Sequence, residues 1–208
     1  MIRFVKTTNT FTLLHQRSEY IIMKKIFISY RRSDAYDTDR LAKSLRIEFG
    51  HENIFFDTES MHPGVDWPES IKDFLMISDL MLLIIGPNWL RIQDDYSGRR
   101  RIDMDNDWVR LEILSFLKRK YSNEKLLLIP VLVNGAKMPE KDYLDEALGI
   151  ICDLQYIQLS NTGSSLDFVP LKNLLLHNRI KPINPPAVVT PITLAPPDPL
   201  TQIEEDEF

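Results

Sequence analysis

The centre of this 208-residue chain holds an unbroken apolar run, Leu80-Met81-Leu82-Leu83-Ile84-Ile85. A strand that is apolar at every position is covered on both faces, which is typical of the middle of a parallel sheet. Outward from this run, short apolar segments alternate with longer segments of helical period between residues 24 and 180. This alternation is the pattern of βα units. The sequence therefore predicts an α/β fold with a mainly parallel sheet.

The same pattern predicts the order of elements on either side of the run. Before it, we expect strands at 25–30 and 53–57 and helices at 36–49 and 68–77. After it, we expect strands at 126–133 and 153–159, a helix that begins near residues 105–107, and a last helix at 165–179. Pro130, inside the strand at 126–133, indicates a bulge or a position nearer an edge of the sheet.

Three parts of the chain differ in composition. Residues 24–180 form one predicted globular domain. Residues 1–23 lack an apolar segment of signal-peptide length, and because Met23 directly precedes the first strand, we expect either a start at Met23 or a short ordered arm. Residues 181–208 contain seven of the thirteen prolines and an acidic end. This composition predicts an extended tail, and a solvated linker is favoured over a partner motif.

Composition excludes several classes of function. The 25 basic residues face 30 acidic ones, and five acids lie in the tail, so the nearly neutral body offers no broad basic face for nucleic acid. The single cysteine, Cys152, excludes an intrachain disulfide, fits a reducing cytoplasm and is expected to be a buried core residue. The four histidines lack ligand spacing, so no metal is expected. No apolar run is long enough for a membrane span.

Polar and aromatic residues follow the ends of three predicted strands, where open parallel sheets bind ligands. Ser29, Tyr30, Arg31, Arg32 and Asp34 follow the first strand. The other candidates follow the second and third strands, and they are Asp57, Trp67 and Trp89. Adjacent arginines suit a phosphate group, and tryptophan rings suit a base or a nicotinamide ring. The alternatives are arginines paired with Asp34 or Asp57, and tryptophans that only pack.

Trp108 and Glu112 are four residues apart, so on a helix the indole and the carboxylate lie on one face. Asp105, Asn106 and Asp107 are candidates for the helix N-cap. A second stripe of this helix is apolar and is expected to face the core: Val109, Ile113, Phe116 and Leu117. Glu112 is thus available to a cleft, where a partly dehydrated carboxylate responds strongly to developing positive charge. The alternative is a solvated helix face.

These segments together resemble the successive signatures of a bacterial-type Toll/interleukin-1 receptor (TIR) domain over roughly residues 24–178. The signatures are the runs at 27–34, 86–90 and 107–112, with Phe55-Phe56-Asp57 and Gly64 between them. The resemblance implies a flavodoxin-like three-layer sandwich with a five-stranded sheet. It also implies a loop at 58–66 for self-association. Many such domains cleave NAD⁺, and in them Glu112 matches the catalytic glutamate, Trp108 its aromatic partner and Arg31 the substrate-side basic residue.

The resemblance thus predicts a cytoplasmic NAD⁺ glycohydrolase or cyclase. NAD⁺ is the substrate and no further cofactor is needed, because nicotinamide is already a cationic leaving group and one carboxylate suffices. We expect a homo-oligomer, a role in bacterial anti-phage defence by analogy, and a possible effector protein that senses the product. The loop at 91–104, with three consecutive arginines at 99–101, is expected to be solvated, with a gate or a protomer contact as the alternative.

Three other functions compete with this prediction. A non-catalytic TIR adaptor or effector would act only by TIR–TIR association. A phospho-acceptor receiver would need an aspartate at the end of the third strand, where Gly86-Pro87-Asn88 stands. A nucleoside deoxyribosyltransferase shares the layout and an attacking glutamate, but its substrates offer no phosphate to the paired arginines.

Overall fold

A computed structural model of the chain describes residues 24–56, 69–162, 165–178 and 180. The predicted N-terminal extension, the association loop at 58–66 and the Pro-rich tail lie outside these residues. The described residues form a five-stranded parallel sheet in the order β2-β1-β3-β4-β5. The strands are β1 (Ile26–Ser29), β2 (Ile54–Phe55), β3 (Leu80–Ile85), β4 (Leu127–Leu132) and β5 (Ile157–Gln158). This order confirms the flavodoxin-like arrangement.

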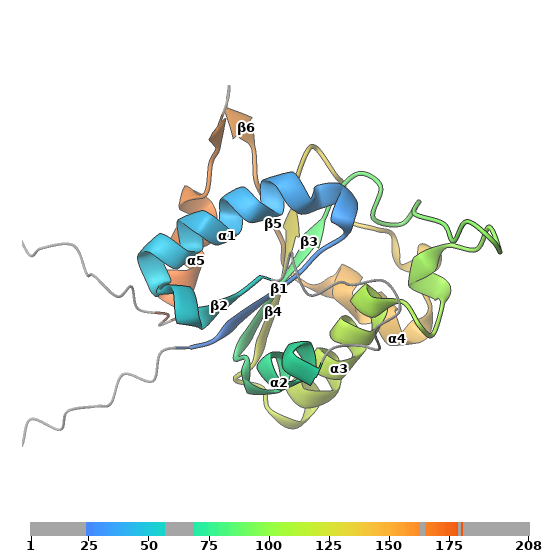
Figure 1. Cartoon of the computed structure of the whole chain (residues 1–208), viewed down its shortest axis with the longest axis horizontal. Helices are drawn as coiled ribbons and strands as arrows, with labels where there is room; N and C mark the ends of the chain where they lie inside the picture. The colour runs from blue at the N-terminus through green and yellow to red at the C-terminus, as the bar shows by residue number, and fades with distance from the viewer. Residues whose placement is uncertain (1–23, 57–68, 163–164, 179, 181–208) are drawn as a thin grey trace, which may run out of the picture.

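Helices cover both faces of the sheet (Figure 1). One face carries α1 (Ala35–Phe49) and α5 (Val169–His177). The other carries α2 (Glu69–Ile77), α3 (Trp108–Ser122) and α4 (Glu146–Gly149). Short 3₁₀ helices join these elements: η1 (Arg32–Asp34), η2 (His51–Asn53), η3 (Arg101–Asp103), η4 (Lys141–Tyr143) and η5 (Ile150–Asp153). The predicted three-layer α/β sandwich is confirmed.

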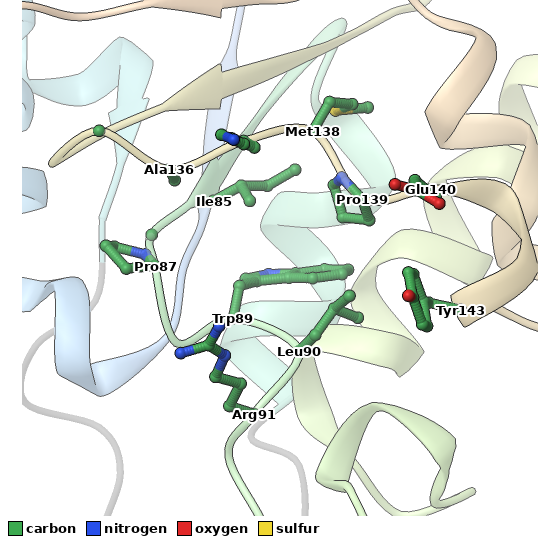
Figure 2. A pocket seen from close by; sticks show the side chains of 13 residues that line it. Ile85, Pro87, Trp89, Leu90, Arg91, Ala136, Met138, Pro139, Glu140 and Tyr143 are labelled. Atoms are coloured by element: carbon green, nitrogen blue, oxygen red, sulfur yellow. The ribbon is translucent and has the colours of Figure 1, made fainter.

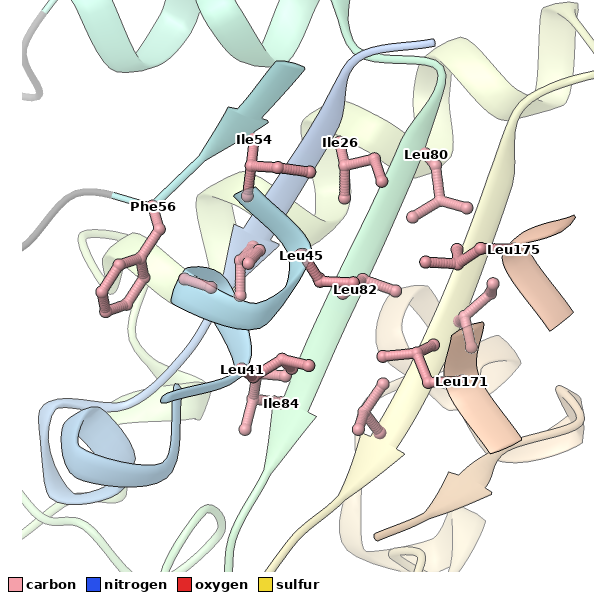
Figure 3. Packing of buried hydrophobic residues seen from close by; sticks show 14 of the residues in the cluster. Ile26, Leu41, Leu45, Ile54, Phe56, Leu80, Leu82, Ile84, Leu171 and Leu175 are labelled. Carbon is pink, nitrogen blue, oxygen red and sulfur yellow. The ribbon is translucent and has the colours of Figure 1, made fainter. Parts of the chain in front are cut away.

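The core has two parts because successive side chains of a strand point to opposite faces. Ile26, Leu80 and Leu82 pack against Leu45 of α1 and Leu175 of α5 in the first part (Figure 3). The residues between them point to the second part, where Phe27, Met81 and Leu83 pack with Ile71, Leu75, Val109, Ile113 and Phe116 of α2 and α3. Every residue of β3 is buried, as the apolar run at the centre of the chain predicts.

Pro130 lies in β4, next to the edge strand β5. The amides of Leu127 and Val133 donate to the β3 side, whereas the carbonyl of Leu132 accepts from β5. By this alternation the nitrogen of Pro130 points toward β5, which pairs only with Val131 and Leu132. The missing N–H of proline therefore costs no hydrogen bond to β3, and the expected position near an edge is confirmed.

Two expected elements differ from the structure. The strand predicted at 153–159 is reduced to Ile157–Gln158, because η5 continues from α4 through Asp153. The helix predicted at 165–179 begins only at Val169, where Pro170 stands in its first turn. Before it, the short strands β6 (Asn161–Thr162) and β7 (Ser165–Leu166) pair antiparallel. Within the described residues, no helix is long and apolar enough to cross a membrane.

Candidate active site

Glu112 and Ser29 meet in the interior of the domain. Ser29 is the last residue of β1 and points to the same face of the sheet as Phe27, because strand side chains alternate. Glu112 lies on α3 beside the buried residue Ile113, and only 6% of it is exposed. The Ser29 hydroxyl donates a 2.6 Å hydrogen bond to Oε2 of Glu112. The predicted catalytic carboxylate is therefore buried and oriented, rather than part of a solvated helix face.

Asp107 sets the beginning of α3. Its backbone is extended, and its Oδ1 accepts a 2.9 Å hydrogen bond from the amide of Arg110. This contact satisfies one of the amides that a helix N-terminus leaves without an intrahelical partner. Asp107 is thus the N-cap among the three predicted candidates. It is also buried, unlike a typical solvent-facing cap.

Arg31 forms a buried ion pair with this cap. Nη1 of Arg31 lies 2.6 Å from Oδ2 of Asp107, and the two residues are 6% and 1% exposed. The guanidinium also lies over the ring of Trp89, 5.9 Å from its centroid. Nε and Nη2 of Arg31 are buried without a hydrogen-bond acceptor among the described residues. The carboxylate that pairs with this arginine is Asp107, whereas Asp34 forms no ion pair with it and Asp57 lies outside the described residues.

The two described tryptophans differ in exposure. Trp89 is 1% exposed and belongs to the second part of the core, which favours the packing interpretation of its ring. Trp108 is partly buried against the same cluster, on the first turn of α3. Trp108 therefore keeps exposed surface near Glu112, whereas Trp89 supports Arg31 from the core side.

The remaining predicted site residues lie apart from Glu112 or outside the described residues. The ring of Tyr30 packs 4.9 Å from that of Phe56, against the first part of the core on the other face of the sheet. Arg32 is exposed at the start of η1. Asp57 and Trp67 lie outside the described residues. The structure thus brings Ser29, Arg31 and Glu112 together and does not bring the Tyr30 ring to them.

A further buried carboxylate, Asp34, is among the candidate residues predicted after the first strand. Asp34 is 4% exposed and lies against Gly86, just after β3, so closely that a Cβ built on Gly86 would be 1.9 Å from Oδ1. Burial raises the pKa of the Asp34 carboxyl, although hydrogen bonds from Ser33 and from the Gly86 amide oppose this effect. The signal in the sequence is a glycine directly after an all-apolar strand, where only a residue without Cβ permits this approach.

The arginine-bearing loop before α3 reaches the site. Gln93 and Arg100 form an antiparallel bridge within it, and Arg100 pairs with Asp103 at 2.7 Å. Nε of Arg101 lies 3.6 Å from Oδ2 of Asp107, while the side chain remains 43% exposed. The loop is therefore folded on itself rather than merely solvated, and it adds a second cation beside Asp107.

A cavity of about 530 Å³ opens between the segments that follow β3 and β4. Trp89 lies among its lining residues, together with Leu90, Met138, Pro139 and Tyr143 (Figure 2). Glu112 does not line it. No group of three or more His, Cys, Asp or Glu side chains that could hold a metal ion occurs in the described part of the chain. Cys152 is half-buried rather than fully buried, and burial raises the pKa of its thiol.

The fold and the buried polar residues define a flavodoxin-like α/β domain with a carboxylate at the carboxyl ends of its strands. A family model described as the TIR domain matches residues 26–175, and the chain belongs to this family. The resemblance stated from the sequence motifs is thereby confirmed. A search of curated protein sequences found no match.

Solved structures of TIR-containing proteins are similar to the chain. The TIR domains of the activated Roq1 resistosome, which directly recognises the pathogen effector XopQ, align with a TM-score of 0.52 at 14% identity, over 74% of this chain and 98% of that one. A metazoan TIR-STING receptor from C. gigas in complex with 2′,3′-cGAMP aligns with a TM-score of 0.46 at 20% identity, over 76% of this chain and 41% of that one. At these identities the Roq1 comparison supports the fold alone.

Proposed function

We propose that this TIR domain is an NAD⁺ glycohydrolase or cyclase in which Glu112 is the catalytic residue. The observation that carries the proposal is the burial of Glu112 at the carboxyl end of β1, with its Oε2 held 2.6 Å from the Ser29 hydroxyl. A carboxylate that is fixed and largely dehydrated before the reaction stabilises a developing positive charge without reorganisation. Membership of the TIR family, which includes NAD⁺-cleaving enzymes, supports the same activity.

The chemistry needs only one carboxylate. When the bond between ribose C1′ and the nicotinamide nitrogen breaks, both bonding electrons go to nicotinamide, which leaves as a neutral molecule. Positive charge develops on the ribose, and Glu112 stabilises it in the transition state. Attack of water at C1′ with loss of a proton gives ADP-ribose. Attack by a nucleophile on the adenosine half of the same molecule gives a cyclic isomer.

The cations beside the carboxylate suit the pyrophosphate of NAD⁺. Two buried guanidinium nitrogens of Arg31 have no acceptor in the described part of the chain, and Arg101 shares the carboxylate of Asp107 with Arg31. The guanidinium groups of Arg31 and Arg101 meet at Asp107, where their N–H groups suit an anionic ligand. A deoxyribosyltransferase substrate without phosphate would not use these donors. The proposal also includes association of TIR domains and a cytoplasmic location. It further includes an anti-phage role and an effector protein that senses the product.

The test is to identify the products. Purified protein is incubated with NAD⁺, dilute and at high or crowded concentration, and the products are identified by mass spectrometry beside Glu112→Ala. We expect nicotinamide from the wild-type protein alone, and the second product separates a hydrolase from a cyclase. Absence of nicotinamide under conditions in which the protein demonstrably assembles would contradict the proposal and favour a non-catalytic adaptor.

A further inference from the structure

Asp107 makes three contacts that join segments from different parts of the chain. Its Oδ1 accepts from the Arg110 amide and caps α3, while its Oδ2 accepts from Arg31, which follows β1. Arg101 approaches the same Oδ2 at 3.6 Å. A helix cap needs only the first of these contacts. The buried ion pair therefore adds a second role, which is to hold the start of α3 against the end of β1.

Two contacts of this kind connect β1 with α3. Ser29 contacts Glu112, and Arg31 contacts Asp107. Ser29 and Arg31 are two residues apart in extended backbone, which separates them by roughly 6.6 Å on one face. Asp107 and Glu112 are five residues apart, which corresponds to roughly 7.5 Å along a helix axis. Both contacts are present together, so they fix the position of α3 along β1 and its rotation.

The ion pair also controls the charge around Glu112. Asp107 and Glu112 are the buried carboxylates at the start and on the second turn of α3. A buried arginine that loses its partner is strongly unfavourable, so it is drawn to another carboxylate. With Asp107 neutralised, the buried carboxylates that remain are Asp34, which already interacts electrostatically with Arg31, and Glu112 on the same helix. Pairing of Arg31 with Glu112 would turn the carboxylate away from the orientation that Ser29 imposes.

We infer that Asp107 is a positioning residue for Glu112: its ion pair with Arg31 locks α3 onto β1 and keeps the Arg31 guanidinium away from the reacting carboxylate. The inference rests on the proposed function, in which Glu112 stabilises the positive charge of the ribose. This role of Asp107 is distinct from its role as the N-cap of α3. Loss of the ion pair is expected to reduce turnover, whereas loss of the cap alone is not. Small displacements of a reacting group are sufficient to reduce a rate by about 100-fold.

The test compares Asp107→Asn with Asp145→Asn. Asparagine remains a good N-cap, so Asp107→Asn keeps the contact with Arg110 and removes only the charge. Asp145 is a matched control, because it caps α4 through the Leu148 amide and pairs with Arg110, yet has no contact with Arg31. We expect kcat for nicotinamide release to fall about 10- to 100-fold in Asp107→Asn, with KM for NAD⁺ within about threefold. Asp145→Asn should keep the wild-type kcat.

An unchanged kcat in Asp107→Asn, or an equal loss in Asp145→Asn, would overturn the inference. If Asp107→Asn does not fold, Asp107→Ser, which keeps a capping oxygen and removes the charge, is measured in its place. The expected loss of kcat is the same.

A second measurement does not depend on activity. Urea unfolding of Ser29→Ala, Asp107→Asn and Ser29→Ala/Asp107→Asn should show non-additive changes in the free energy of unfolding, because both contacts hold the same pair of elements. Strictly additive changes would overturn the lock between α3 and β1. If the wild-type protein releases no nicotinamide, the proposed function fails, while this cycle still decides whether the two contacts act together.

Discussion

The hydroxyl of Ser29 donates a 2.6 Å hydrogen bond to Glu112 across 83 residues of sequence. Both residues are buried, so little water competes for this hydrogen bond. A hydrogen bond from a neutral donor to a buried carboxylate is charge-assisted and stronger than a bond between neutral groups. The hydroxyl of Ser29 therefore helps to orient the Glu112 carboxylate.

Removing the hydroxyl should reduce activity more than stability. In Ser29→Ala, Glu112 loses its oriented donor, and we expect kcat for nicotinamide release to fall about tenfold. Ser122→Ala is the matched control, because Ser122 is exposed at the end of α3. Steady-state kinetics with NAD⁺ measures both variants. Equal rates for Ser29→Ala and wild type would show that the contact has no part in turnover.

The two adjacent arginines should differ sharply in their effect on stability. Arg31→Met leaves the buried carboxylate of Asp107 without its closest partner, and the free energy of unfolding should decrease by about 3–5 kcal/mol. Arg32 is exposed, so Arg32→Met should change it by less than about 0.5 kcal/mol. Urea denaturation of the two variants gives the comparison. Similar losses would contradict the ion-pair geometry described here.

Gly86 should tolerate no side chain. A Cβ at this position would be 1.9 Å from Oδ1 of Asp34, so Gly86→Ala must displace the first loop from β3. We expect a loss of about 1–3 kcal/mol in the free energy of unfolding. Gly149→Ala is the control, since its Cβ would meet only the flexible side chain of Lys141 at 3.3 Å in a helical turn. A thermal melt in which Gly86→Ala equals wild type would contradict the close approach.

The pH dependence of stability should distinguish Asp34 from Asp145. Burial raises the pKa of Asp34 in the folded state above its unfolded-state pKa of about 4. Ionisation of Asp34 therefore destabilises the fold as the pH rises from the unfolded-state pKa through the folded-state pKa. Asp34→Asn should therefore gain stability relative to wild type between pH 4 and pH 7.

Asp145 should show the opposite sign. Partial burial raises the pKa of Asp145. Hydrogen bonds from the Arg110 guanidinium and the Leu148 amide lower it by a larger amount in total, so the folded-state pKa is depressed. This contribution to stability is present above the unfolded pKa and is lost as pH falls. Asp145→Asn should therefore lose stability relative to wild type as pH rises from about 3 to 6. Urea unfolding at each pH measures both variants, and trends of the same sign would contradict the assignment.

The sheet and most helices could be predicted from the sequence, because each strand is a short apolar run and each long helix has an apolar stripe. The run at Leu80–Ile85 predicts a central strand, and all its residues are buried in β3. The short β6 and β7 hairpin and the reduced β5 were missed. Two-residue strands carry too few residues to establish a period, and a 3₁₀ turn such as η5 lacks the apolar spacing of an α-helix.

The candidate site was predicted only in part. The position of Glu112 near the end of the first strand follows from the rule that parallel sheets bind ligands at their carboxyl ends. The pairing of Arg31 with Asp107 could not be predicted, because sequence spacing does not say which of several carboxylates meets a given arginine. The close contact of Asp34 with Gly86 depends on tertiary packing as well. The predicted site residues Asp57 and Trp67 remain predictions.

The most direct test of the central claim compares nicotinamide release by wild type, Glu112→Gln and Glu124→Gln at equal concentration and equal state of assembly. Glu124 is exposed just after α3, so its variant makes the same chemical change outside the site. We predict that wild type and Glu124→Gln cleave NAD⁺ at the same rate, whereas Glu112→Gln remains folded and loses at least about 100-fold in kcat. Equal cleavage by Glu112→Gln would contradict the assignment of Glu112 as the catalytic residue.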